Sequence, residues 1–312
     1  MSLKLDPSAA KYMEMIDHPP AGTPFTPPDI SGLRMASAST EYAVQTQELE
    51  SIKNIQIDGP YGQIDLRLFK PKGIAPDALA SGMVYIHGGG WVIGGLDDFA
   101  PVCNFLAEKS KSIVIAINYR LAPEYPFPVA PNEVIHAWEW VTQNTHSLGI
   151  DADRLSIAGD SAGANMAAVC AIDARNKKGI QPKAQILFYP VTDQADEMPS
   201  YARANGETPL SADEMRWYRN QYLCSREEAL NWKASPLRAQ DLAGLPRTFI
   251  VTVGHDPLCD EGIAYARRLQ NEGVLVTHVH LSGIIHGFLR MAKIIQVAAP
   301  VMEFAAAFQK SI

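Results

Sequence analysis

The chain has 312 residues, 47% of them hydrophobic and 20% charged, which is enough to bury one large core, and we expect one domain with an appended subdomain. Its net charge of −7 argues against a nucleic-acid partner and against stable association with anionic membranes. The sequence has no segment apolar enough for a membrane span or a signal peptide, and its four scattered cysteines lack metal-ligand or redox spacing, so we expect a cytoplasmic protein with reduced thiols.

The first fifty residues carry a helix signal but no strand. Asp6-Pro7 predicts a helix start, because a capping residue is followed by proline at the first helical position, and the helix should run to about Ile16. His18-Pro19-Pro20 should end it, and the proline-rich stretch up to Ile30 is predicted to be loop. We therefore expect an N-terminal extension that packs on the rest of the molecule.

Two kinds of strand pattern come next. Ile52–Asp58 and Gln63–Phe69 flank a turn, and the second run alternates apolar and polar residues as a half-buried antiparallel strand does. Later runs are short and almost continuously apolar, which is typical of strands buried on both faces of a parallel sheet. These runs are Met83–Ile86, Ile113–Ile117, Leu155–Ala158, Ile186–Tyr189 and Phe249–Val253. A further strand is expected around His278 and His280.

Helical stretches alternate with these runs, which predicts an α/β sheet with right-handed crossovers. The stretches are Phe99–Ser110, Val129–Thr145, Ser161–Asn176, Glu261–Glu272 and a closing helix from about Ala292 to Phe308.

The interval from Asp193 to Gly244 contains helical segments but no strand pattern. Ser211–Glu214 reads as a capping box, and Met215, Tyr218 and Tyr222 then fall on one helical stripe. Inserted after a strand of the sheet, this interval could cover the carboxyl edge as a cap. A stripe that only packs on the sheet fits the pattern equally well.

The pattern G-D-S-A-G at Gly159–Gly163 follows an apolar run and precedes an alanine-rich helical stretch. This is the G-x-S-x-G pattern in the strand, turn and helix context of a nucleophile elbow. Such a turn holds the serine in strained backbone geometry, and its glycines let strand and helix approach closely. Ser161 would then project at the carboxyl edge of the sheet. An ordinary strand–helix turn of small residues is the alternative.

A glycine-rich stretch, H-G-G-G-W at His87–Trp91, directly follows the run Met83–Ile86. Three consecutive glycines cost backbone entropy, and a loop whose N–H groups converge on a developing oxyanion would need them. A plain glycine-rich turn is the alternative. A phosphate-binding loop is disfavoured, because neither G-x-G-x-x-G nor a terminal Lys-Ser/Thr is present.

An elbow serine in this architecture is followed along the chain by an acid and then by a histidine. His286 lies in a loop after the last expected strand, where it could reach Ser161, so we predict it as the base. Asp256 comes directly after the run Phe249–Val253, at the strand end that meets the elbow, and is the predicted acid.

Other candidates fit these roles less well. Asp193 occupies a similar strand end and is the second choice for the acid, whereas Asp260 and Glu261 fall in the first turn of a helix. His278 and His280 are spaced to face solvent from one strand. A metal site built on that pair would need a third ligand, which is not evident, so neither a metal nor an organic cofactor is predicted.

Five motifs that occur in order resemble the hormone-sensitive-lipase family of α/β-hydrolases, in the bacterial esterase branch with a G-D-S-A-G elbow. They are H-G-G-G-W at 87–91, Y-R-L-A-P-E at 119–124, G-D-S-A-G at 159–163, D-P-L with D-E-G at 256–262, and H-G-F at 286–288. The resemblance covers nearly the whole chain. It implies an α/β-hydrolase fold, with a mostly parallel eight-stranded sheet flanked by helices and a helical cap. Residues 1–50 and 193–235 would form the cap, and residues 51–192 and 236–312 the catalytic domain.

The resemblance also implies a role for each matching residue. Ser161 would be the nucleophile, His286 the general base and then acid, and Asp256 the group that orients the imidazole. The oxyanion hole would use backbone amides of Gly88, Gly89, Gly90 and Ala162, with Gly88 the weakest of the four. Arg120 and Glu124 look like a structural pair of the family, located behind the site.

The predicted function is hydrolysis of carboxylic esters with short to medium acyl chains, through an acyl-enzyme on the serine. The cap would supply an apolar lining from Trp91, Met215 and Tyr218 for the acyl chain. An amide or formamide hydrolase with the same triad is the first alternative. A small-ligand receptor that lost the chemistry is the second, although the presence of His286 counts against it. The partner is then a small ester, and relatives often form homodimers, here around Val276–Leu281.

Overall fold

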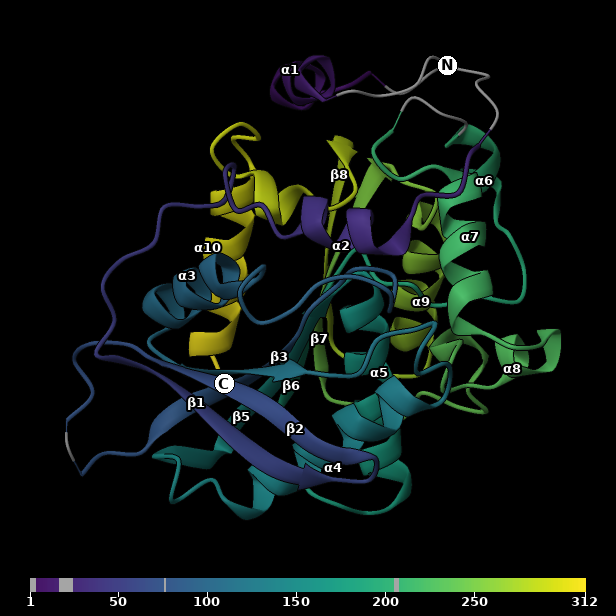
Figure 1. Ribbon diagram of the computed structural model, residues 1–312. Helices are drawn as coiled ribbons and strands as arrows, with labels where there is room; N and C mark the ends of the chain where they lie inside the picture. The colour runs from purple at the N-terminus through teal and green to yellow at the C-terminus, as the bar shows by residue number, and fades with distance from the viewer. Residues whose placement is uncertain (1–3, 17–24, 76, 205–207) are drawn as a thin grey trace.

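The computed structural model describes residues 4–16, 25–75, 77–204 and 208–312, and one eight-stranded sheet forms its centre (Figure 1). The strand order is β1-β2-β4-β3-β5-β6-β7-β8. The pairs β1–β2 and β2–β4 are antiparallel and every other pair is parallel, which confirms the predicted, mostly parallel α/β sheet. The strands are β1 (Ser51–Gly59), β2 (Gly62–Lys70), β3 (Ala80–Ile86), β4 (Ile113–Asn118), β5 (Ile150–Asp160), β6 (Ala184–Phe188), β7 (Arg247–His255) and β8 (Val276–Ile285).

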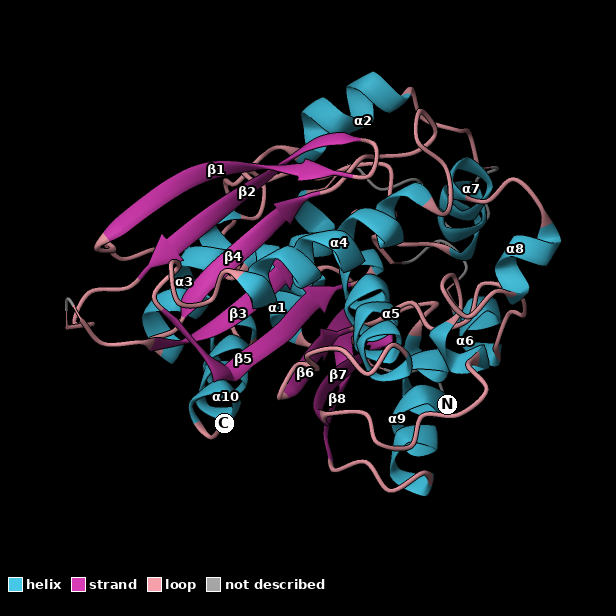
Figure 2. Cartoon of the chain, turned by 90° about the horizontal axis from the view of Figure 1, so that it is seen from below, coloured by secondary structure: helices cyan, strands magenta, loops and turns pink. Residues whose placement is uncertain are grey.

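Helices cover both faces of this sheet (Figure 2). α3 and α10 pack against each other over one face, and α4, α5 and α9 cover the other face. Because both faces are covered, β3, β6 and β7 are buried along almost their whole length, which explains their lack of alternation in the sequence. β1 is an edge strand and is mostly exposed. The helices are α1 (Pro7–Met15), α2 (Ile30–Ser37), α3 (Ala100–Ser110), α4 (Val129–Gln143), α5 (Ala162–Asn176), α9 (Cys259–Asn271) and α10 (Ala298–Lys310).

The interval that follows β6 is helical, as predicted, and its described residues contain no strand. It comprises α6 (Pro199–Arg203), α7 (Ala212–Tyr222), α8 (Arg226–Leu230) and a short 3₁₀ turn, Pro236–Arg238. The predicted capping box begins α7: the Ser211 hydroxyl accepts from the Glu214 N–H, and Glu214 accepts from the Ser211 N–H.

Two helices differ from the prediction. α2 was not anticipated, since prolines dominate the sequence before it, but Asp29 caps it by accepting the Gly32 N–H at 2.7 Å. The last helix begins at Ala298 rather than near Ala292, because a 3₁₀ turn at Phe288–Met291 intervenes. The predicted helix end at His18 lies outside the described residues. No helix in the described part of the chain has the length and apolar character to cross a membrane.

Candidate active site

Ser161 lies at the turn between β5 and α5 in a strained conformation. Its φ is +54°, a left-handed value that a residue with a side chain rarely adopts. The turn is tight because two glycines leave room for it: a Cβ on Gly159 would lie 2.5 Å from the Gly163 carbonyl carbon, and one on Gly163 would lie 2.0 Å from the Ile86 carbonyl oxygen. The sequence pattern predicted this elbow, and the close approach of β3, β5 and α5 gives its physical reason.

A hydrogen-bonded relay joins the three predicted triad residues. His286 Nε2 lies 2.9 Å from Ser161 Oγ, and His286 Nδ1 lies 2.7 Å from Asp256 Oδ2. The other Asp256 oxygen accepts the Leu258 N–H at 2.9 Å, which fixes the carboxylate at the end of β7. Tyr189 packs its ring against the imidazole, with centroids 4.6 Å apart. The arrangement can move a proton from a serine hydroxyl to an imidazole whose other nitrogen is held by a buried carboxylate.

The competing acids are engaged elsewhere. Asp193, the second choice, forms a two-pronged ion pair with Arg238 at 2.7 and 2.9 Å. Asp260 pairs with Arg203. Glu261 is fully buried and accepts the backbone N–H of Thr192 at 2.6 Å.

The glycine loop after β3 lies beside the elbow. The Gly88 N–H is donated to Asp160 Oδ1 at 3.0 Å, so it is not free to bind a substrate oxygen, and the expectation for Gly88 is corrected here. Gly89 and Gly90 have φ values of +112° and +58°, which need glycine. Ala162 is the first residue of α5, so its N–H has no carbonyl partner within the helix.

Asp160 is a buried carboxyl that sequence reasoning missed. It accepts the Tyr85 hydroxyl at 2.8 Å as well as the Gly88 N–H. Burial raises the pKa of Asp160 to about 6, although these hydrogen bonds act to lower it. Its place inside the G-D-S-A-G motif was the only available signal.

The three residues predicted to line the acyl-chain site differ in their burial. Tyr218 is half-buried and lies on the glycine loop, where a Cβ added to Gly90 would be 2.4 Å from its ring. Trp91 is fully buried and stacks on Tyr222 with centroids 4.3 Å apart, so it offers no open surface to an acyl chain. Met215 is 4% exposed and lies on the same side of α7 as Tyr218.

Two further expectations are corrected. Arg120 and Glu124 do not pair with each other: Arg120 pairs with the buried Glu133, and Glu124 pairs with Arg34 on α2. The expectation that both His278 and His280 face solvent is wrong for His278, which is half-buried, whereas His280 is exposed. Thr252 Oγ1 lies 2.8 Å from His278 Nε2 and 2.9 Å from His280 Nδ1.

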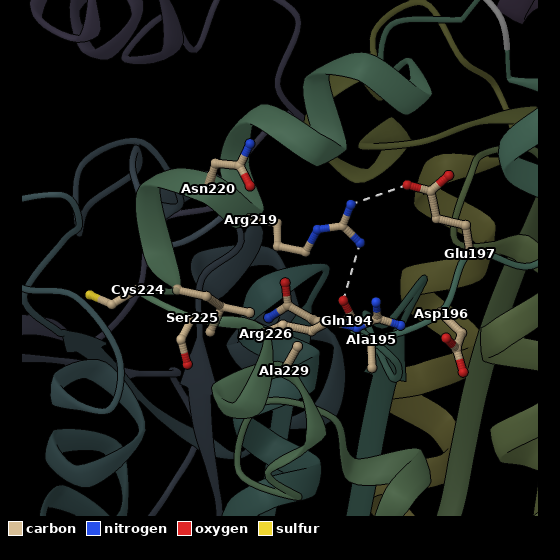
Figure 3. A pocket seen from close by; sticks show the side chains of 11 residues that line it. Gln194, Ala195, Asp196, Glu197, Arg219, Asn220, Cys224, Ser225, Arg226 and Ala229 are labelled. Carbon is tan, nitrogen blue, oxygen red and sulfur yellow. Dashed lines mark hydrogen bonds and ion pairs between the residues drawn. The ribbon is translucent and has the colours of Figure 1, made fainter.

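A cavity of about 500 Å³ opens between the loop after β6 and the helices α7 and α8 (Figure 3). Arg219 lies within it between Glu197 and the carbonyl of Gln194, as Figure 3 shows. None of the predicted site residues is among the described residues that line this cavity. The described residues also include no group of three or more His, Cys, Asp or Glu side chains that could hold a metal ion.

Comparison with sequence families gives one clear match. The family model described as alpha/beta hydrolase fold matches residues 83–290, which include the glycine loop, the elbow and the loop of His286. Among curated proteins, ethyl acetate hydrolase of Pseudomonas putida is 31% identical over 303 residues, which are 95% of this chain and 95% of that protein. Carboxylesterase NlhH of Mycobacterium tuberculosis is 38% identical over 222 residues, 70% of this chain and 69% of that one.

Solved structures agree with this match. An ester hydrolase from the metagenome of Lake Arreo, complexed with a bipyridine phosphonate derivative, superposes with a TM-score of 0.92 at 35% identity, covering 98% of each chain. A hyperthermophilic esterase from Pyrobaculum calidifontis superposes with a TM-score of 0.90 at 33% identity, covering 99% of this chain and 98% of that one.

Proposed function

The chain belongs to the α/β-hydrolase family, in its hormone-sensitive-lipase group, and from that premise we propose how this ester hydrolase performs its reaction. Ser161 is the nucleophile, His286 the general base and acid, and Asp256 the group that orients His286. The relay of 2.9 and 2.7 Å among these three side chains is the observation that carries the proposal.

The reaction proceeds by acyl transfer in two halves. Ser161 Oγ attacks the ester carbonyl carbon as His286 Nε2 takes the hydroxyl proton, and the carbonyl oxygen becomes an oxyanion. His286 then protonates the leaving alcohol, which leaves an acyl group on Ser161. Water, deprotonated by His286, attacks the acyl-enzyme; His286 then returns the proton to Ser161 Oγ as the bond to the acyl group breaks, and the carboxylic acid is released. Asp256 stabilises the imidazolium that forms in each half.

The oxyanion is held by the backbone amides of Gly89, Gly90 and Ala162. The left-handed φ values of the two glycines and the position of Ala162 at the start of α5 support this assignment. Losing one such donor typically reduces kcat by about 100- to 1,000-fold.

A cap covers this centre in the proposal. It comprises residues 1–50 and 193–235, above a catalytic domain of residues 51–192 and 236–312; residues 1–3, 17–24 and 205–207 lie outside the described residues. The contact of Tyr218 with Gly90 and the bond from Arg34 to the Val92 carbonyl support a cap that contacts the glycine loop. Tyr218 and Met215 make this side of α7 apolar, which suits short to medium acyl chains.

The test is turnover of a p-nitrophenyl ester panel by the wild type and by Ser161→Ala. We expect Ser161→Ala to lose about 10⁴-fold or more in kcat with an unchanged circular dichroism spectrum. Ser147→Ala removes an exposed hydroxyl on another loop and should match the wild type. Unchanged turnover by Ser161→Ala would refute the nucleophile. Preferential cleavage of anilides or N-formyl substrates would favour the amidase alternative, and a wild type inert to all of them would favour a receptor.

A further inference from the structure

Arg34 connects the N-terminal segment to the glycine loop. It extends from α2, which Figure 1 shows in purple in the upper half of the molecule, below α1. Arg34 Nε donates to the Val92 carbonyl at 2.9 Å, and Nη2 donates to the Ala122 carbonyl at 3.0 Å. The same guanidinium makes a two-pronged ion pair with Glu124, at 2.8 and 2.7 Å. A planar guanidinium suits this set of acceptors, because its donors lie in a fixed fork.

Both carbonyls belong to backbone that is already joined to the glycine loop. The Val92 N–H donates to the Gly89 carbonyl at 3.0 Å, and the Ala122 N–H donates to the Trp91 carbonyl at 2.8 Å. Arg34 therefore holds the carboxyl-terminal end of the loop, whereas Asp160 holds the amino-terminal end through the Gly88 N–H.

The loop between these two anchors is strained. Gly89, Gly90 and Trp91 have φ values of +112°, +58° and +63°, and a left-handed tryptophan is unfavourable without external constraint. Such conformations persist only where surrounding contacts hold them in place. The amides of Gly89 and Gly90 must nevertheless stay aimed at one point if they are to bind an oxyanion.

The ion pair and the carbonyl bonds of Arg34 are expected to contribute differently to holding the loop in place. The side chains of Arg34 and Glu124 are 32% and 52% exposed, and an ion pair at this exposure contributes little by itself. The bond to the Val92 carbonyl acts directly on the loop, and the bond to the Ala122 carbonyl acts on it through the Ala122–Trp91 hydrogen bond. The guanidinium charge that makes them strong is constant, because the hydrogen bonds with Glu124 raise the already high pKa of Arg34.

We propose that Arg34 is a positioning residue for the oxyanion hole: it holds the loop of residues 88–92 in the conformation that aims the Gly89 and Gly90 amides at the substrate oxygen. This inference rests on the proposed function. It assigns to α2 a part in transition-state stabilisation, in addition to covering the site.

The experiment compares Arg34→Met, Arg34→Lys and Glu124→Gln with a matched control, Arg154→Met. Arg154 makes the same two kinds of contact, an ion pair with Asp151 and a bond to the Leu79 carbonyl, near the start of β5 and away from the loop. The measurements are kcat and KM for a p-nitrophenyl ester, the inhibition constant of an alkyl trifluoromethyl ketone, and the thermal midpoint. The ketone reports on the oxyanion hole because a serine oxygen adds to its carbonyl carbon while the hydroxyl proton passes to the base. The carbonyl oxygen then becomes an oxyanion in a tetrahedral adduct.

For Arg34→Met we expect kcat to fall about 10- to 100-fold, less than the full loss of an oxyanion donor, while KM changes by less than about threefold. The ketone should lose affinity by the same factor as kcat/KM. Arg34→Lys should be intermediate, because an ammonium cannot reach all three acceptors, and Glu124→Gln and Arg154→Met should stay close to the wild type. Millimolar guanidinium should restore part of the kcat of an Arg34→Ala variant.

Three results would overturn the inference alone, while ester turnover still depends on Ser161. The first is an Arg34→Met enzyme with wild-type kcat and ketone affinity. The second is a loss of kcat in Arg34→Met without a parallel loss of ketone affinity. The third is an equal loss in Arg154→Met, which would indicate a general effect on stability. If the wild type does not hydrolyse esters at all, the proposed function fails first.

Discussion

His87 is a residue whose protonation state is set by its surroundings rather than by a charged partner. Its ring is buried between Phe99 and Tyr119, with centroids 5.4 and 4.3 Å away, and Nδ1 lies 2.8 Å from the Gly88 carbonyl oxygen. Burial lowers the pKa of His87 to about 4. The imidazole therefore stays neutral in the folded protein at pH values where it is protonated in the unfolded chain.

This difference makes His87 a source of acid lability. Between pH 6.5 and about 4 the unfolded chain binds a proton at this position that the folded protein does not, so stability falls as the pH falls. The full effect is about 3 kcal/mol. We predict that the free energy of unfolding, measured in urea from pH 7.5 to 4.5, falls less steeply for His87→Gln than for the wild type, even if the variant is less stable at neutral pH.

The comparison between variant and wild type is needed because Asp160 acts in the opposite direction. Its raised pKa, about 6, means that the folded protein gains stability from this carboxyl as the pH falls from 6. Both proteins carry Asp160, so its contribution cancels in the difference. Parallel pH curves for wild type and His87→Gln would contradict the account of His87.

At the scale of elements, the junction of β3, β5 and α5 decides where Ser161, the proposed nucleophile, lies. A Cβ on Gly163 would approach the Ile86 carbonyl oxygen to 2.0 Å, a contact with backbone that cannot rotate away. We predict that Gly163→Ala lowers the free energy of unfolding by about 1–3 kcal/mol through overpacking. It should also lower kcat by about 100-fold, because α5 and Ser161 must shift.

Gly179→Ala is the control for this prediction. It adds the same methyl group where the nearest atom is 3.6 Å away and φ is not left-handed. Its free energy of unfolding should change by less than about 1 kcal/mol, with kcat unaffected. Equal behaviour of the two variants in urea unfolding and in ester turnover would contradict the tight-junction account.

Local pattern predicted most of these elements, and it selected three side chains that hydrogen bonds join in the structure. The continuous apolar runs indicated the buried strands, and the order of elbow serine, strand-end acid and late histidine indicated which residues would meet. Contacts between distant segments were not predictable in this way. The family resemblance suggested Arg120 and Glu124 as a structural pair, whereas Glu133 on α4 is the partner of Arg120. Arg34 contacts Val92 from a helix that the sequence did not reveal. The burial of side chains was also not predictable. Trp91 was predicted to line the acyl-chain site, but the ring of Tyr222, which is distant in the sequence, stacks on it.

At the scale of the whole molecule, hydrogen bonds join the last helix to the middle of the sheet. Gln309 of α10 is fully buried; its amide nitrogen donates to the Gly82 carbonyl at 3.1 Å, and its amide oxygen accepts the Ser156 hydroxyl. These bonds join β3, β5 and α10 across the face opposite α5. We expect them to serve stability, because the hydrogen bonds of the three side-chain and backbone groups run among Gln309, Ser156 and Gly82 and not to the proposed triad.

Gln309→Leu should therefore separate stability from chemistry. It removes the amide donor to the Gly82 carbonyl and the amide acceptor of the Ser156 hydroxyl, which keep only a long bond of 3.4 Å to each other. We predict a loss of about 1–3 kcal/mol in the free energy of unfolding. At a temperature where both proteins are folded, kcat/KM should stay within about twofold of the wild type. Lys310→Ala, at the exposed neighbour, should be neutral. A stable Gln309→Leu, or an equally unstable Lys310→Ala, would contradict the claim that the Gln309 hydrogen bonds stabilise the fold.

Covalent labelling by a fluorophosphonate tests the central claim most directly, since it requires a serine made nucleophilic by its neighbours. The serine oxygen forms a bond to phosphorus, fluoride leaves, and the hydroxyl proton passes to the base. We predict one adduct per chain on the peptide that contains Ser161, no adduct in Ser161→Ala, and labelling slowed by at least about 100-fold in His286→Ala. An adduct on another residue, or labelling of Ser161→Ala at the wild-type rate, would contradict the account.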